Sequence, residues 1–339
     1  MSEGKKRIEW IDIAKGIGIL LVVLAHLNRN MSEGFVTYAY SFHLPLFFFL
    51  SGYLFSHEKY KSSKEFVISR FKALIIPYMF FAAISLALTL IVSRHDLRLN
   101  NAISEALYIN GASLQSNRPI WFLVCIFFVE LFFYLLRKVI KREILMAPAV
   151  LLSSVTGYLL YMFLLPKRLP FGIDIAFTAL AFYGAGNLLK RKQPEFKLRV
   201  PKLLLAAFGI ILGVLISVFL QTANVDMYKL TYGNYFYFYT AAFLGIASTI
   251  MFSQFISKTI FSKLFSYFGR NSLIIMCTHY LIIFVVTLFE GKILKKASLF
   301  DIHSNFLGLG NLAIVVLVSM PVIYVLNRHF PVLVGKRRV

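Results

Sequence analysis

The first long apolar segment of the chain, at about residues 11–28, carries ionisable side chains that an apolar helix does not need. Lys15 and His26 are eleven residues apart. At 100° per residue this spacing places them on one face of a helix, about 16 Å apart along its axis. Asp12 lies three residues before Lys15, so the two side chains can form an ion pair. The face offers a cation and an imidazole, which can act as a general base or as a nucleophile.

Each of these three residues also has a purely structural interpretation. Lys15 can extend its ammonium group to the inner membrane surface, as long cationic side chains do. Asp12 can stabilise the positive end of the helix dipole. A lone buried histidine often only forms a hydrogen bond between helices, but the face that His26 shares with Lys15 favours a functional role.

A second histidine lies in the next apolar segment, at about residues 36–55. His43 precedes Pro45 by two residues, and a proline inside a helix removes a backbone donor and bends the helix. A bend beside an imidazole would form a pocket wall, although a bend that only improves packing has the same sequence. We place His43 at a depth similar to that of His26.

Five further polar or aromatic positions stand out along the chain. Arg70 and Lys72, at the start of the third apolar segment, could bind phosphate groups, or they could simply mark the inner side of the membrane. Glu130 follows Trp121 within one apolar segment, and His279 lies near the middle of another. Either side chain could contact a substrate or only form a bond between helices.

Composition defines the elements that must position these residues. The chain has 339 residues, of which 59% are hydrophobic and 15% are charged, whereas about 25% are charged in an ordinary soluble domain. This excludes a soluble globular domain and a disordered chain, and predicts an all-α integral membrane protein with a single transmembrane domain over residues 1–339. About ten apolar segments approach the length of a membrane-spanning helix, at about 11–28, 36–55, 73–93, 119–136, 145–165, 171–189, 203–220, 235–257, 271–289 and 305–326.

The distribution of basic residues predicts the topology. The formal net charge is +21, and most of the 36 Lys and Arg residues fall on one side if the N-terminus is inside. This asymmetry is the positive-inside pattern, with both termini cytoplasmic. The charge therefore reports orientation and some affinity for anionic lipid, and we expect no nucleic-acid partner.

Other common kinds of site are absent from the sequence. Cys125 and Cys277 both lie in apolar runs, so we expect neither a disulfide framework nor a metal site. The chain contains no HExxH, GxSxG, Walker A or GxGxxG motif, which excludes the soluble enzyme classes that these motifs mark.

The chemistry-bearing segments together resemble the integral membrane acyltransferase-3 family, in particular its sugar O-acetyltransferase branch related to fucose 4-O-acetylases. The most specific match is Ile11–Gly16 leading to His26, where a basic residue is followed by ten residues and then a histidine. Many members carry Arg at the first position; Lys15 keeps the charge but loses bidentate geometry. The other matching segments are Phe42–Phe48 with Ser51–Tyr53, Arg70 through Tyr78, Trp121–Leu123, and Gly269–Leu273 with His279.

The resemblance implies that an acyl group, usually acetyl, moves from cytoplasmic acetyl-CoA to a sugar hydroxyl of a cell-surface glycan or its precursor. Acyl-CoA is then a donor substrate, no cofactor is permanently bound, and the other partners are a glycan acceptor, free or lipid-linked, and membrane lipid. The expected location is the bacterial cytoplasmic (inner) membrane. The implied roles are catalysis by His26, Lys15, Asp12 and His43, donor binding by Lys15, Arg70 and Lys72, and acceptor binding by His43, Trp121, Glu130 and His279.

Two other classes of protein fit part of the pattern. A secondary transporter or a flippase for a lipid-linked glycan would also carry buried charges and a proline inside a helix. That class predicts inverted halves and a site between broken helices, whereas the polar residues here gather in the first two segments. A membrane scaffold without chemistry leaves the shared face of Lys15 and His26 unexplained.

Overall fold

The computed structural model describes residues 7–27, 30–92, 117–164, 168–192, 201–292 and 304–336. Within these ranges the chain is helical, with one isolated β-bridge between Asp226 and Thr231. This confirms the all-α class. Both ends of the chain, which we expect on the cytoplasmic side, lie outside the described residues.

Each of the ten predicted segments coincides with a long helix, and two shorter helices, α3 and α11, were not predicted. A π-helical turn at Phe71–Ile75 joins α3 to α4, and a second one at Ile216–Leu220 extends α9. The α-helices are α1 (Glu9–His26), α2 (Glu33–Leu54), α3 (Ser63–Arg70), α4 (Ile76–Val92), α6 (Trp121–Val139), α7 (Met146–Leu164), α8 (Ile173–Lys192), α9 (Lys202–Leu215), α10 (Tyr235–Ile256), α11 (Ser262–Arg270), α12 (Ser272–Lys292) and α13 (Asn305–His329).

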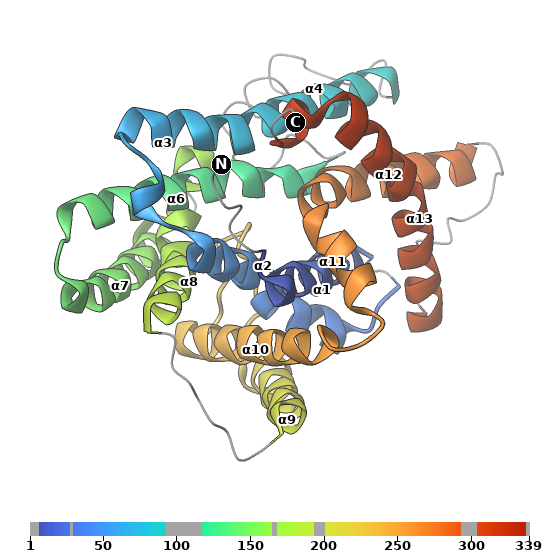
Figure 1. The fold of residues 1–339 in the computed structure, drawn as a ribbon. Coiled ribbons are helices and arrows are strands. Elements are labelled where there is room, and N and C mark those ends of the chain that lie inside the picture. Colours follow the sequence, from blue (N-terminus) through green and yellow to red (C-terminus); the bar gives the residue numbers. More distant parts are fainter. Residues whose placement is uncertain are drawn as a thin grey trace.

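Helices α1 and α2 lie at the centre of the molecule (Figure 1). Helix α1 packs against α2, α10, α11 and α12, and α2 packs against α8 and α10 as well. Helices α3, α4 and α6 run along one side of this pair, with α9 and α10 on the opposite side and α7 and α13 at the flanks. The helices that carry His26 and His43 are therefore surrounded by protein.

Glycines allow the two tightest crossings of the central helices. A Cβ atom at Gly16 of α1 would collide with the Phe265 carbonyl of α11, and one at Gly269 would collide with the Asp12 carbonyl. The α2–α8 crossing is built in the same way, because a Cβ at Gly186 would collide with the Phe49 carbonyl. Small residues at helix crossings let backbones approach closely within a membrane. The matching motif around Gly16 is thus also a packing motif.

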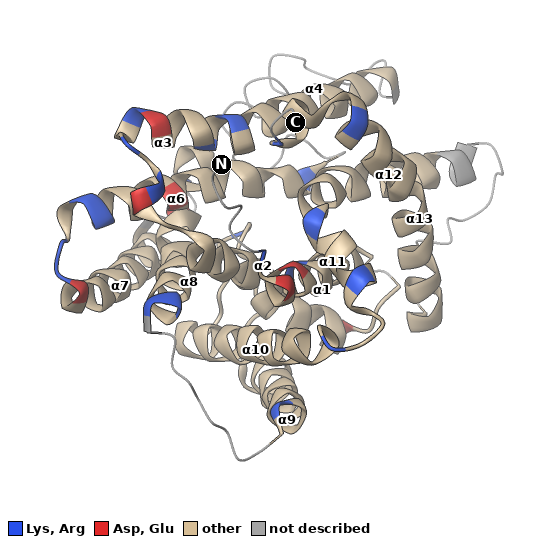
Figure 2. Cartoon of the chain, in the orientation of Figure 1, with Lys and Arg blue, Asp and Glu red and all other residues tan. Residues whose placement is uncertain are grey.

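Within the described part of the chain, seven helices are long and apolar enough to cross a membrane, or eight if the bent pair α11 and α12, at 77°, forms one span. The seven do not include α1 or α2, although both are long, so the number of about ten spans stays a prediction. The reason is their polarity, since α1 carries Glu9, Asp12 and Lys15 within 18 residues. In Figure 2 the outer helices α10 and α13 are free of charged residues over most of their length.

Candidate active site

A cavity of about 520 Å³ brings together residues from α1, α2, α6 and α12. Helix α2 continues through Pro45 as one helix, with His43 in its buried part. Most of the predicted site residues share this cavity although they come from four separate regions of the sequence. Those that line it are Lys15, His26, His43, Arg70, Trp121 and Glu130.

One face of α1 forms a continuous wall of the cavity. Lys15, Ile19, Val22 and His26 all line it, and their spacings of four, three and four residues are those of one helix face. The shared face predicted for Lys15 and His26 is therefore confirmed. Since the helix rises 1.5 Å per residue, the wall carries a cation at one level and an imidazole about 16 Å further along.

Cationic groups with unused donors mark the Lys15 level of the cavity. Arg70 contacts Glu130 with 3.5 Å between Nη1 and Oε2, at the outer limit of a hydrogen bond, and its Nε is buried without a described partner. Within the described part of the chain Lys15 has no ion pair, although Asp12 and Glu130 are the acidic groups whose field reaches it. A buried donor without an acceptor is costly, so this end of the cavity is suited to an anion.

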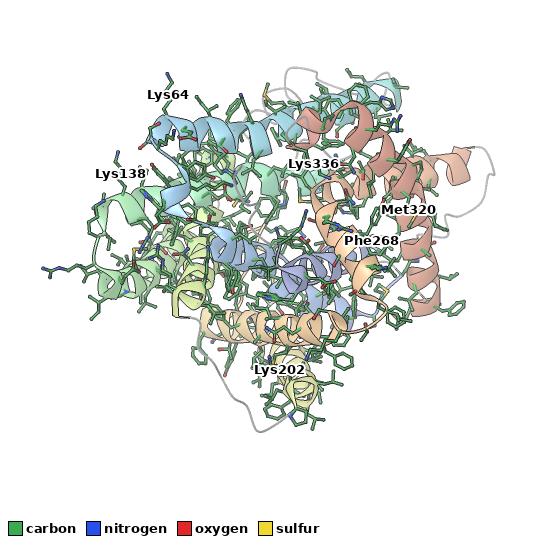
Figure 3. The ribbon with its side chains drawn as sticks, viewed as in Figure 1. Lys64, Lys138, Lys202, Phe268, Met320 and Lys336 are labelled. Carbon is green, nitrogen blue, oxygen red and sulfur yellow. The ribbon has the colours of Figure 1, made fainter. Side chains whose placement is uncertain are left out.

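The turn after α13 also contributes to the cavity wall. Gly335 lines it at a φ of 71°, and a Cβ there would lie 2.6 Å from the Ala73 carbonyl oxygen. Lys336 lies between helices, whereas Lys64 projects away from α3 (Figure 3). The Lys336 ammonium donates to Asn327 Oδ1 at 2.6 Å, and burial lowers the pKa of Lys336.

The hydrogen bonds of His26 and His43 determine which ring nitrogen is free. The Nδ1 of His26 lies 2.7 Å from the Val22 carbonyl oxygen, and the Nδ1 of His43 contacts the Ala39 carbonyl in the same way. Because a carbonyl oxygen only accepts, Nδ1 must carry the proton in both rings. In the neutral imidazole the lone pair is then on Nε2, so each ring that lines the cavity has a basic nitrogen available.

His279 does not line the cavity. It is fully buried, and its Nε2 lies 3.3 Å from Nδ1 of His26. The structure therefore places this residue behind His26, where it contacts the imidazole and not the cavity that a substrate would enter.

Asp12 and Lys72 also lie away from the cavity wall. The expected ion pair of Asp12 with Lys15 is absent among the described residues; Arg7 donates instead to both carboxylate oxygens of Asp12. Arg7 can reach the Asp12 carboxylate because Arg7 precedes α1 and Asp12 lies in the first turn of that helix. Lys72 is exposed on the π-helical turn, while its neighbours Ala73 and Leu74 line the cavity.

The comparison with known families agrees with this arrangement. The family model described as an acyltransferase domain, that of the acyltransferase-3 family, matches residues 8–328. The chain belongs to the acyltransferase-3 family. Neither the curated proteins nor the solved structures contain a significant match to it. Membership supports membrane acyltransferase activity in general, and the cavity is the place in this acyltransferase where acidic, basic and nucleophilic groups meet.

Several cavity residues of the acyltransferase escaped the sequence analysis. Asp226, Tyr228 and Lys229 reach it from the loop before α10, and Arg118 reaches it from the turn before α6. The loop is held in place because Arg168 donates to the Tyr228 carbonyl at 2.8 Å. A signal was present, since Asp226 is the only acidic residue between positions 195 and 290.

Proposed function

We propose that this acyltransferase moves an acetyl or other short acyl group from acyl-CoA to a sugar hydroxyl of a cell-surface glycan or its precursor, in the cytoplasmic membrane of a bacterium. One observation carries the proposal: a single cavity joins the incompletely paired cations Lys15 and Arg70 to the imidazoles of His26 and His43. A donor with phosphates at one end and a reactive thioester at the other fits that order of groups.

The donor would be held at its phosphate end. Arg binds phosphate bidentately and Lys acts as a point charge, and Arg70 has a buried Nε without a described partner. The extended arm of acyl-CoA would then follow the α1 wall toward His26, over the distance of about 16 Å set by the helix rise. Lys72, exposed just outside the cavity, would add attraction for the phosphates.

The imidazole of His26 would act as the general base. Its Nε2 takes the proton from the acceptor hydroxyl while that oxygen attacks the thioester carbon. The carbon–sulfur bond then breaks, and the CoA thiolate leaves and takes the proton back from His26. An imidazole can both accept and donate a proton, which suits both halves of this transfer.

A covalent route through His26 uses the same atoms. In that route Nε2 attacks the thioester carbon itself, CoA leaves, and an acyl-imidazole carries the acyl group until the acceptor hydroxyl displaces it. Acid quenching after mixing with acetyl-CoA alone, followed by peptide mass spectrometry, distinguishes the routes. An acetyl group on His26 indicates the covalent route, and its absence with full transfer activity indicates the general base.

The acceptor would occupy the part of the cavity away from Lys15 and Arg70. Trp121 and Tyr228 both line it with their rings 5.4 Å apart, and aromatic faces are common partners of sugar rings. His43 would orient the acceptor hydroxyl. Glu130, which we expected at the acceptor, contacts Arg70 and would orient that cation at the donor end.

The test measures base-releasable acetate on surface glycan in a strain that lacks the gene. The strain receives the wild-type gene, His26→Gln, or His329→Gln at equal membrane levels; His329 is exposed at the end of α13 and serves as the matched control. We expect acetate to return with wild type and His329→Gln, and to fall about 100-fold or more with His26→Gln. Equal restoration by His26→Gln contradicts the mechanism. A change in glycan export without any change in acyl groups favours the transporter class.

A further inference from the structure

The imidazole of His279 contacts that of His26 and has no place in the mechanism so far. The two residues are 253 positions apart in sequence, on α12 and α1. Their ring centroids lie 5.0 Å apart, and the His279 side chain is fully buried behind the cavity wall. Such a contact needs a reason, because an imidazole is expensive to bury unless its nitrogens are bonded.

The protons of this pair can be assigned from the carbonyl groups around it. The Nδ1 of His279 lies 2.9 Å from the Ile275 carbonyl oxygen and must donate to it. In the neutral ring the lone pair of His279 is then on Nε2, which lies 3.3 Å from the protonated Nδ1 of His26. The His26 proton therefore has two acceptors, the Val22 carbonyl and His279 Nε2.

We propose that His279 is a positioning residue for His26, an inference that rests on the proposed function. The Nε2 of His279 accepts a hydrogen bond from the protonated Nδ1 of His26. This bond keeps the free Nε2 of His26 directed to the cavity. It also stabilises the imidazolium that forms when His26 takes up a second proton. No atom of His279 touches the acyl group. Its bond to Ile275 in turn orients the His279 ring.

The surroundings of His26 explain why its hydrogen-bond acceptor is a neutral imidazole and not a carboxylate. Tyr40 and Tyr280 face its ring at centroid distances of 6.3 and 5.6 Å. His43 on α2 and Asp226 in the loop before α10 are near enough for an electrostatic interaction with it. A carboxylate behind His26 would be an unpaired charge within the helix bundle, which is costly in a membrane. A second imidazole accepts the same proton without that cost.

Two amide substitutions separate the proposed role from mere packing. The Asn amide reaches the position of Nδ1 in histidine, and the Gln amide reaches the position of Nε2. His279→Gln can therefore offer an acceptor to His26, whereas His279→Asn can only bond near Ile275. Each purified full-length variant is compared with wild type in detergent, using acetyl-CoA as the donor and thermal unfolding as the check of folding.

We expect kcat to fall about 10- to 100-fold in His279→Asn, the range typical of residues that orient a functional side chain through a hydrogen bond. His279→Gln should stay within about fivefold of wild type, and the KM for acetyl-CoA should change less than about twofold in both. Equal loss in the two variants, or a loss expressed mainly in KM, overturns the proposal.

Chemical labelling gives a readout that does not depend on activity. Diethyl pyrocarbonate modifies unprotonated imidazole nitrogens, and mass spectrometry locates the label. We expect label on His26 and none on His279 in wild type, with His26 labelled several-fold more slowly in His279→Asn than in His279→Gln. Label on His279, or equal rates at His26, overturns the inference. If these labelling results hold while wild type transfers no acyl group, the pair stands and the proposed function fails.

Discussion

Polar and apolar side chains are distributed in opposite ways on the central helices, α1 and α2, and on the outer helices, α9 and α13. Helix α1 buries Asp12 and places Lys15 and His26 on its cavity face, whereas α9 and the π-helical turn after it carry no ionisable residue beyond Lys202. Leu46 of α2 is fully buried, and Leu204 of α9 is 62% exposed. Polar groups are tolerated where other helices surround them, and apolar groups cover the surface that lipid would contact.

The comparison predicts the largest difference at helix crossings. Gly16→Ala should destabilise the protein by about 3 kcal/mol, because the added carbon meets the Phe265 carbonyl of α11. Gly310→Ala on α13 is the matched control, since a Cβ there has nothing within 4 Å. Thermal unfolding in detergent measures both, and equal stabilities would show that the α1–α11 crossing yields easily.

Packing in the centre should matter next. Leu46→Ala leaves a hole among buried side chains and should cost about 2 kcal/mol. Leu204→Ala should change stability by less than about 0.5 kcal/mol, because an exposed side chain exchanges one apolar contact for another. The same unfolding assay compares the two variants. A large effect at Leu204 would mean that this face of α9 is covered by protein.

A smaller effect is expected at the cationic end of the cavity. Lys15→Met should raise the KM for acetyl-CoA about tenfold, which is about 1.4 kcal/mol, with little change in stability. Lys64→Met is the control, because Lys64 is exposed on α3 and does not line the cavity. Steady-state kinetics at constant ionic strength decides the matter, and equal KM values in the two variants would remove Lys15 from donor binding.

The smallest effect is expected where α1 begins. Arg7→Gln removes the partner of Asp12, but the Arg7 side chain is 65% exposed, and such pairs contribute about 1 kcal/mol or less. Unfolding midpoints in low and high salt should converge for wild type and variant. A loss of stability well above 1 kcal/mol would show that the Asp12–Arg7 pair behaves as a buried ion pair.

Sequence reasoning succeeded where one helix contains the whole relationship. The shared face of Lys15 and His26 follows from helical spacing, and the cavity confirms it. The spacing of three that suggested an ion pair between Asp12 and Lys15 did not account for Arg7, which competes from outside the helix. Helical spacing predicts which side chains of one helix can form a contact, but it does not predict whether a residue outside the helix lies nearer.

Contacts between distant helices were beyond such rules. His279 was expected at the substrate, yet it lies behind His26 because α12 packs against α1. The loop that carries Asp226 has no periodic pattern, so its isolated acidic residue made the loop unusual without indicating that it would reach the cavity. The π-helical turn after Arg70, which brings Ala73 and Leu74 to the wall, likewise has no sequence signature.

Trp121 in the cavity wall gives the protein a built-in optical reporter. The chain has only two tryptophans, and the other, Trp10, packs against Tyr53 and does not line the cavity. Trp10→Phe therefore leaves a single indole emitter at the wall. Its emission wavelength and quenching would follow the arrival of a ligand in real time, without any label, turnover or knowledge of the acceptor.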